Sequence, residues 1–84
     1  MDHPPVKLYA LSTCGHCRNT RNFLDTNGIE YICIEVDLTS GEERQTVLDE
    51  VRGLNPNCSF PTLVIGDKVI VGFKEAEIRE ALGL

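Results

Sequence analysis

The apolar and polar positions of the chain follow strand-like and helix-like spacings in turn. Apolar runs typical of short strands cover 6–11, 31–37, 62–65 and 68–71. Apolar residues three or four positions apart predict helices at 17–27, 40–54 and 75–82. The predicted order is therefore strand, helix, strand, helix, strand, strand, helix, which makes an α/β domain.

The strands are expected to form one mixed sheet. Residues 6–11 are apolar on both faces, which is typical of a central strand. The helix between the first two strands makes them parallel. Gly66-Asp67 is a two-residue hairpin loop, so the last two strands are antiparallel. We expect a four-stranded sheet flanked by three helices.

The predicted helices have recognisable ends and apolar faces. Asn27-Gly28 and Gly83 are typical C-terminal stops. Ser40-Gly41-Glu42-Glu43 resembles a capping box at the start of the second helix. The inward-facing positions are expected to be Phe23, Leu24, Val47, Leu48, Val51, Leu54, Ile78, Ala81 and Leu82.

Size and charge limit the classes of function. The chain has 84 residues and no repeat or linker, which predicts a single domain over 1–84. It carries 13 acidic and 8 basic residues without a basic stripe, so nucleic acid is not an expected partner. No apolar run is long enough for a bilayer and no secretory signal is visible. We expect a cytoplasmic protein that does not bind membranes.

The segment Cys14-Gly15-His16-Cys17 carries the candidate chemistry. It stands between a predicted strand and a predicted helix, so Cys14 lies near a helix N-terminus. Free backbone N–H groups and the helix dipole stabilise a thiolate there. Without an export signal, such a pair indicates redox chemistry rather than a structural disulfide. The sequence predicts a redox-active disulfide between Cys14 and Cys17 and, accordingly, thiol–disulfide exchange.

Each residue of this segment has an expected role. Cys14 is the predicted nucleophile, and Cys17, one helical turn later and more buried, resolves the mixed disulfide. A charged His16 favours the thiolate and makes the disulfide more oxidising, although a merely solvated histidine is the alternative. Thr13 either donates a hydrogen bond to the Cys14 sulfur or satisfies turn backbone.

Two arginines and the remaining histidine allow simpler interpretations as well. Arg18 and Arg21 follow the motif and either add positive potential near Cys14 or are ordinary solvated helix charges. His3 is expected to be a surface residue in an extended arm over Met1–Pro5.

The other two cysteines are expected to differ from each other. Cys33 lies among isoleucines and is expected in the core as a small apolar residue. Cys58 stands three positions before Pro61, near the expected site rim. It either exchanges disulfides or binds metal with Cys14 and Cys17, or it is a half-buried loop thiol.

The chain resembles the glutaredoxin branch of the thioredoxin superfamily in three features. These are the order of its elements, the segment Cys14-Gly15-His16-Cys17 after the first strand, and the segment Ser59-Phe60-Pro61-Thr62 at the start of the third strand. The resemblance covers nearly the whole chain. It implies a thioredoxin fold and an enzyme, a monomeric protein-disulfide reductase. It also implies a cis Pro61 against the Cys-x-x-Cys turn. The implied substrate-binding residues are Thr13, Phe60, Thr62, Gly72 and Phe73.

Two positions depart from glutathione-using glutaredoxins, and they bear on the electron donor. Those proteins usually have Lys or Arg where this chain has Leu11, and an acid where it has Lys74. Gly72-Phe73 instead looks like the NrdH-type redoxins, which take electrons from a flavin thioredoxin reductase. The resemblance implies no bound cofactor or metal. It implies disulfide-bearing protein substrates and electrons from a thioredoxin-reductase-type or ferredoxin-dependent reductase, or from glutathione.

Three alternatives remain at the level of sequence. Cys14, Cys17 and Cys58 would hold zinc together with a fourth group, since structural zinc usually takes four ligands, or would bridge an iron–sulfur cluster between two subunits. A redox-sensing interaction protein would use the same thiol pair without turnover. A thiol oxidase or isomerase would suit His16 but not the missing export signal.

Overall fold

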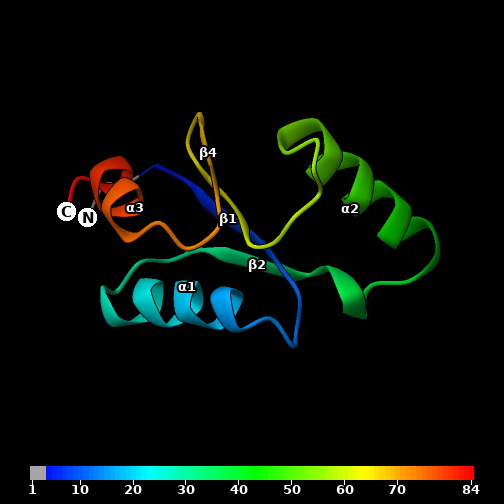
Figure 1. The fold of residues 1–84 in the computed structure, drawn as a ribbon, viewed down its shortest axis with the longest axis horizontal. Coiled ribbons are helices and arrows are strands. Elements are labelled where there is room, and N and C mark those ends of the chain that lie inside the picture. Colours follow the sequence, from blue (N-terminus) through cyan, green and yellow to red (C-terminus); the bar gives the residue numbers. More distant parts are fainter. Residues whose placement is uncertain (1–3) are drawn as a thin grey trace.

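The computed structural model describes residues 4–84, so His3 and the first part of the expected arm lie outside the described residues. Its elements are β1 (Val6–Ala10), α1 (Gly15–Thr26), β2 (Ile32–Glu35), the short 3-10 helix η1 (Val36–Leu38), α2 (Gly41–Leu54), β3 (Thr62–Ile65), β4 (Lys68–Val71) and α3 (Glu75–Leu82). The predicted thioredoxin fold, with a mixed four-stranded sheet and three helices, is confirmed (Figure 1).

The sheet has the strand order β2-β1-β3-β4, which places β1 inside it as predicted. Strands β1 and β2 are parallel, with Leu8 opposite Cys33. Strand β3 runs antiparallel to β1, with Leu63 opposite Leu8, and β4 runs antiparallel to β3. The loop after β1 therefore leaves from the middle of the sheet, where neighbouring strands support it.

Two core clusters lie on opposite faces of the sheet. Leu8 belongs to the cluster that contains Leu24 of α1 and Ile78 of α3. Tyr9 belongs to the second cluster, with Val47 and Val51 of α2. Successive residues of a strand point to opposite faces, so β1 must be apolar at consecutive positions to serve both clusters. In Figure 1, α1 and α2 accordingly lie on different sides of the strands.

Several predicted boundaries and one predicted cap were wrong. Helix α1 begins at Gly15 rather than at 17, because Cys14 is its N-cap and accepts a hydrogen bond from the Cys17 N–H. Strand β2 ends at Glu35 rather than at 37, because the chain turns into the short η1 helix. Ser40 is the N-cap of α2 without a side-chain hydrogen bond. Gly41 has φ +59°, and this left-handed step gives the chain a different entry from that of a capping box.

Burial predicts that Leu24 contributes much more to stability than a surface leucine. Leu24 is 0% exposed between α1 and the sheet, whereas Leu38 is 69% exposed. We expect Leu24→Ala to lower the free energy of unfolding by about 2–5 kcal/mol. Leu38→Ala is the matched control and should change it by less than about 0.5 kcal/mol. Urea denaturation measures both, and equal losses would contradict the placement of α1.

Candidate active site

The cysteine pair lies where the central strand ends and α1 begins. Cys14 has extended backbone angles, φ −86° and ψ 122°, and its Sγ accepts a hydrogen bond from the Cys17 N–H at 3.3 Å. Its own N–H donates to the Leu11 carbonyl at 3.2 Å. The sulfur thus takes the place of the side-chain oxygen that usually caps a helix. It lies at the positive end of the helix dipole, where a thiolate is favoured.

The two thiols of the pair have different surroundings. All four cysteines are free thiols, with Cys14 half-buried and Cys17 only 1% exposed. Burial, followed by the hydrogen bond with Cys14, raises the pKa of Cys17 to about 12. The Cys17 thiol therefore keeps its proton at neutral pH, while Cys14 is the less buried sulfur of the pair.

The remaining residues of the turn are exposed. Thr13 and His16 both lie at the surface, on either side of Cys14. The hydrogen bond to the Cys14 sulfur comes from the backbone of Cys17 and not from the Thr13 hydroxyl. Of the two alternatives for Thr13, a hydrogen bond from its hydroxyl to the Cys14 sulfur is therefore not found among the described residues.

The segment before β3 is held by buried hydrogen bonds. The Phe60–Pro61 peptide is cis, as expected from the resemblance, and Pro61 is buried. The Asn55 side chain, only 4% exposed, donates to the Ser59 carbonyl at 3.1 Å and to Thr62 Oγ1 at 3.3 Å. No role of Asn55 in the site is predicted from the sequence. Its one sequence signal is a polar residue directly after an amphipathic helix.

The expected substrate-binding residues differ in what they expose. Thr62 is fully buried, and its hydroxyl donates to the Ser59 carbonyl at 2.8 Å, so this side chain is used internally. Phe60 is half-buried between the two core clusters. The Gly72 N–H donates to the Pro61 carbonyl at 2.9 Å and links β4 to the cis-proline segment. Phe73 is half-buried and packs edge-to-face on the Phe23 ring, with centroids 6.0 Å apart.

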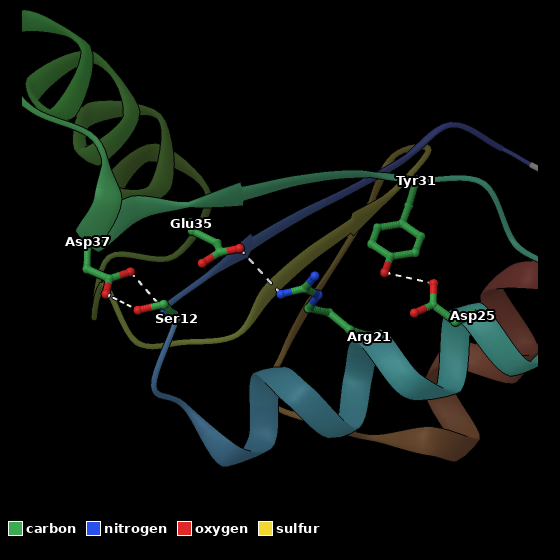
Figure 2. Close-up of polar contacts among 6 residues, drawn as sticks. All are labelled: Ser12, Arg21, Asp25, Tyr31, Glu35 and Asp37. Carbon is green, nitrogen blue, oxygen red and sulfur yellow. Dashed lines mark hydrogen bonds and ion pairs between the residues drawn. The ribbon is translucent and has the colours of Figure 1, made fainter.

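A second set of contacts ties the active-site turn and α1 to the region of β2 (Figure 2). The Asp37 carboxylate accepts from the Ser12 N–H at 2.9 Å and from the Ser12 hydroxyl at 2.5 Å. These hydrogen bonds lower the pKa of Asp37. Arg21 forms an ion pair with Glu35 at 3.4 Å, so its charge is not free for Cys14. The sequence motifs gave no signal for Ser12 and Asp37, which lie 25 positions apart.

A groove of about 240 Å³ runs beside the cysteine pair along α1. The end of the groove nearest the turn is lined by Leu11, Ser12, Cys14 and Cys17. The rest of the groove is lined by side chains of α1, namely Arg18, Arg21, Asn22 and Asp25. The groove therefore places polar side chains of α1 next to the two thiols.

The two other cysteines lie away from this groove. Cys33 packs against the first core cluster, in agreement with the prediction, and burial raises the pKa of its thiol. Cys58 has φ +53° and packs half-buried against the second core cluster. Within residues 4–84, no group of three or more His, Cys, Asp or Glu side chains is placed to hold a metal ion. Within one copy of the chain, Cys14, Cys17 and Cys58 therefore do not form the three-ligand set that the zinc alternative requires.

Comparisons with known proteins agree with this arrangement. The family model for glutaredoxin matches residues 6–70. An uncharacterized glutaredoxin-like 8.6 kDa protein in the rubredoxin operon of Clostridium pasteurianum is 32% identical over 77 residues, which are 92% of this chain and 96% of that protein. Within residues 4–84, no helix is long and apolar enough to cross a membrane.

Two solved structures are close in fold. Methanoredoxin from Methanosarcina acetivorans is 41% identical with a TM-score of 0.94, and the match covers 100% of this chain and 90% of that one. The glutaredoxin grx-1 from Archaeoglobus fulgidus is 37% identical with a TM-score of 0.87, and the match covers 93% and 85% of the two chains. The similarity therefore extends over the cysteine turn and the cis-proline segment together.

The Ser12–Asp37 contact predicts a pH-dependent part of the stability. Because the folded-state pKa of Asp37 lies below 3.8, its stabilising contribution is present above that pH and is lost as the pH falls through the lowered pKa. Asp37→Asn should therefore be less stable than the parent at about pH 7, and the difference should shrink towards about pH 3. Urea unfolding at both pH values measures this. Asp67→Asn, at the exposed hairpin tip, is the matched control; a difference that does not change with pH contradicts the assignment.

Proposed function

Because the chain belongs to the glutaredoxin family of thiol oxidoreductases, we propose that it reduces protein disulfides through a Cys14–Cys17 dithiol couple. The observation that carries this proposal is the inequality of the two thiols. One sulfur caps α1 and is half-buried, and the other is 1% exposed with its pKa raised to about 12. A pair of this kind suits a nucleophile and a resolving thiol.

The proposed cycle transfers two electrons. The Cys14 thiolate attacks one sulfur of the substrate disulfide, the substrate S–S bond breaks, and the departing thiolate takes up a proton. Cys17 then gives up its proton and attacks Cys14 Sγ. This second step breaks the mixed disulfide and leaves a Cys14–Cys17 disulfide, and the other substrate sulfur departs as a thiolate that takes up the second proton. The substrate has gained two electrons and two protons.

The surrounding residues have proposed supporting roles. The Cys17 N–H stabilises negative charge on Cys14, as its 3.3 Å contact suggests. His16 is exposed beside the pair and would favour the thiolate when charged. The backbone of Phe60 before the cis Pro61, together with Thr13, Gly72 and Phe73, would receive the substrate chain. Thr62 would contribute through its backbone, since its side chain is buried.

A reductase, and not glutathione, is the proposed electron donor. Leu11 packs against the second core cluster, so the position three residues before Cys14 carries no cation for a glutathione carboxylate. Lys74 forms an ion pair with Glu77 at 3.8 Å just before α3, where an acid would be needed to bind the glutathione ammonium group. Both observations favour a thioredoxin-reductase-type or ferredoxin-dependent donor.

The proposed roles of Cys14 and Cys17 predict that replacing each of them stops disulfide reduction at a different step. Cys14→Ser should abolish reduction of insulin disulfides, because none of the other three thiols caps a helix N-terminus that would stabilise its thiolate. Cys17→Ser should still attack and should accumulate a mixed disulfide, seen on non-reducing gels and by mass spectrometry. Cys33→Ser is the matched control and should retain turnover. Insulin reduction by Cys14→Ser at the parent rate would refute the assignment, whereas slow exchange by the parent itself would favour a redox sensor.

The proposed donor class predicts a difference between two coupled assays. With NADPH and thioredoxin reductase, the oxidised protein should sustain consumption of NADPH in the presence of a disulfide substrate. With glutathione, glutathione reductase and NADPH, consumption should be at least about tenfold slower, equivalent to about 1.4 kcal/mol of lost transition-state binding. Comparable rates would show that Leu11 and Lys74 do not exclude glutathione.

A further inference from the structure

Arg18 is one of two basic residues in the described part of this acidic chain that have no hydrogen-bonded or ionic partner. Ion pairs occupy five of the eight basic residues, namely Lys7, Arg21, Arg52, Lys74 and Arg79. Arg44 donates to the Asp37 carbonyl at 3.0 Å. In the described part of the chain, only Arg18 and Lys68 remain without a hydrogen-bonded or ionic partner.

The two unpaired cations lie at opposite ends of the sheet. Arg18 follows Cys17 in the first turns of α1 and lines the same groove as both cysteines. Lys68 pairs with Ile65, and Ile65 pairs with Val6 at the start of β1, whereas the cysteine turn follows the end of β1. Arg18 is therefore the free positive charge beside the reactive sulfur.

The acids around the groove do not neutralise Arg18 directly. Asp25 accepts a hydrogen bond from the Tyr31 hydroxyl at 2.9 Å, and Asp37 accepts two from Ser12 (Figure 2). Glu35 is paired with Arg21, which lines the same groove (Figure 2). These contacts hold the three carboxylates against the protein, so the Arg18 guanidinium is left to meet a group from outside.

We propose that Arg18 selects disulfides that carry a carboxylate close to the sulfur attacked by Cys14. A guanidinium binds a carboxylate in a planar, two-point contact. The groove joins Arg18 to Cys14, so one substrate can touch both residues. The carboxylate belongs either to a small disulfide or to an Asp or Glu beside a protein cysteine. This inference rests on the proposed disulfide exchange at Cys14.

The test compares two chromogenic aromatic disulfides of similar shape. Dithiobis(nitrobenzoate) carries a carboxylate on each ring, and dithiodipyridine is neutral. The rate constant for reaction with the reduced protein is measured by stopped flow for the parent, for Arg18→Gln and for the control Lys68→Gln. Because a general effect on Cys14 changes both rates, the anionic-to-neutral ratio isolates the contact with the carboxylate.

Arg18→Gln should lower the anionic-to-neutral ratio by about two- to fivefold, the range for an exposed ion pair. Arg18→Glu should lower it further, and Lys68→Gln should leave it unchanged. Added salt should lower the parent's ratio and leave that of Arg18→Gln unaffected. Thermal unfolding followed by circular dichroism checks that each variant is folded.

A second arm identifies the source of the carboxylate. It uses a pair of peptide disulfides that differ only in Glu or Gln beside the cysteine. An Arg18-dependent preference for the Glu peptide assigns the groove to acidic protein segments, and a preference confined to the aromatic pair assigns it to small anionic disulfides. An unchanged ratio in both arms, with all disulfides reduced, overturns the role of Arg18 alone. A parent protein that reduces none of them overturns the proposed function instead.

Discussion

The contact between the Cys17 N–H and the Cys14 sulfur is the interaction on which the site depends. It joins the first turn of α1 to the proposed nucleophile, so the helix dipole and a free backbone donor act on one atom. The contact exists only if α1 begins directly after the turn that follows β1. Burial of Cys17 and Leu24 at 1% and 0% exposure holds the helix against the sheet in that position.

Burial of Cys17 serves both stability and chemistry. The same apolar contacts that fix α1 also raise the pKa of this thiol, because a thiolate loses hydration there. The buried, protonated Cys17 thiol therefore lies beside the less buried Cys14 sulfur. The order of the two proposed steps thus follows from packing, without any additional catalytic group.

Charge pairing in the structure changes the reading of the basic residues. From the sequence, Arg18 and Arg21 are equivalent neighbours of the cysteine motif. In the fold, the Arg21 guanidinium forms an ion pair with Glu35 of β2, whereas the Arg18 guanidinium lines the groove without an ion-pair partner. An overall charge of −5 therefore coexists with a local positive site at the reactive end. The difference between the two arginines arises because β2, which carries Glu35, lies beside α1 at Arg21.

The sequence by itself determined the order of the elements, the parallel and antiparallel strands and the cysteine pair at a helix start. Those features are local: apolar spacing, a Gly66-Asp67 loop and a four-residue motif each act over neighbouring positions. The tertiary structure alone decided the end of β2, the Ser12–Asp37 contact and the buried hydrogen bonds of Asn55. Each of these features depends on contacts between residues that are distant in the chain or on exclusion of water. Neither distant contacts nor exclusion of water produces a periodic pattern in the sequence.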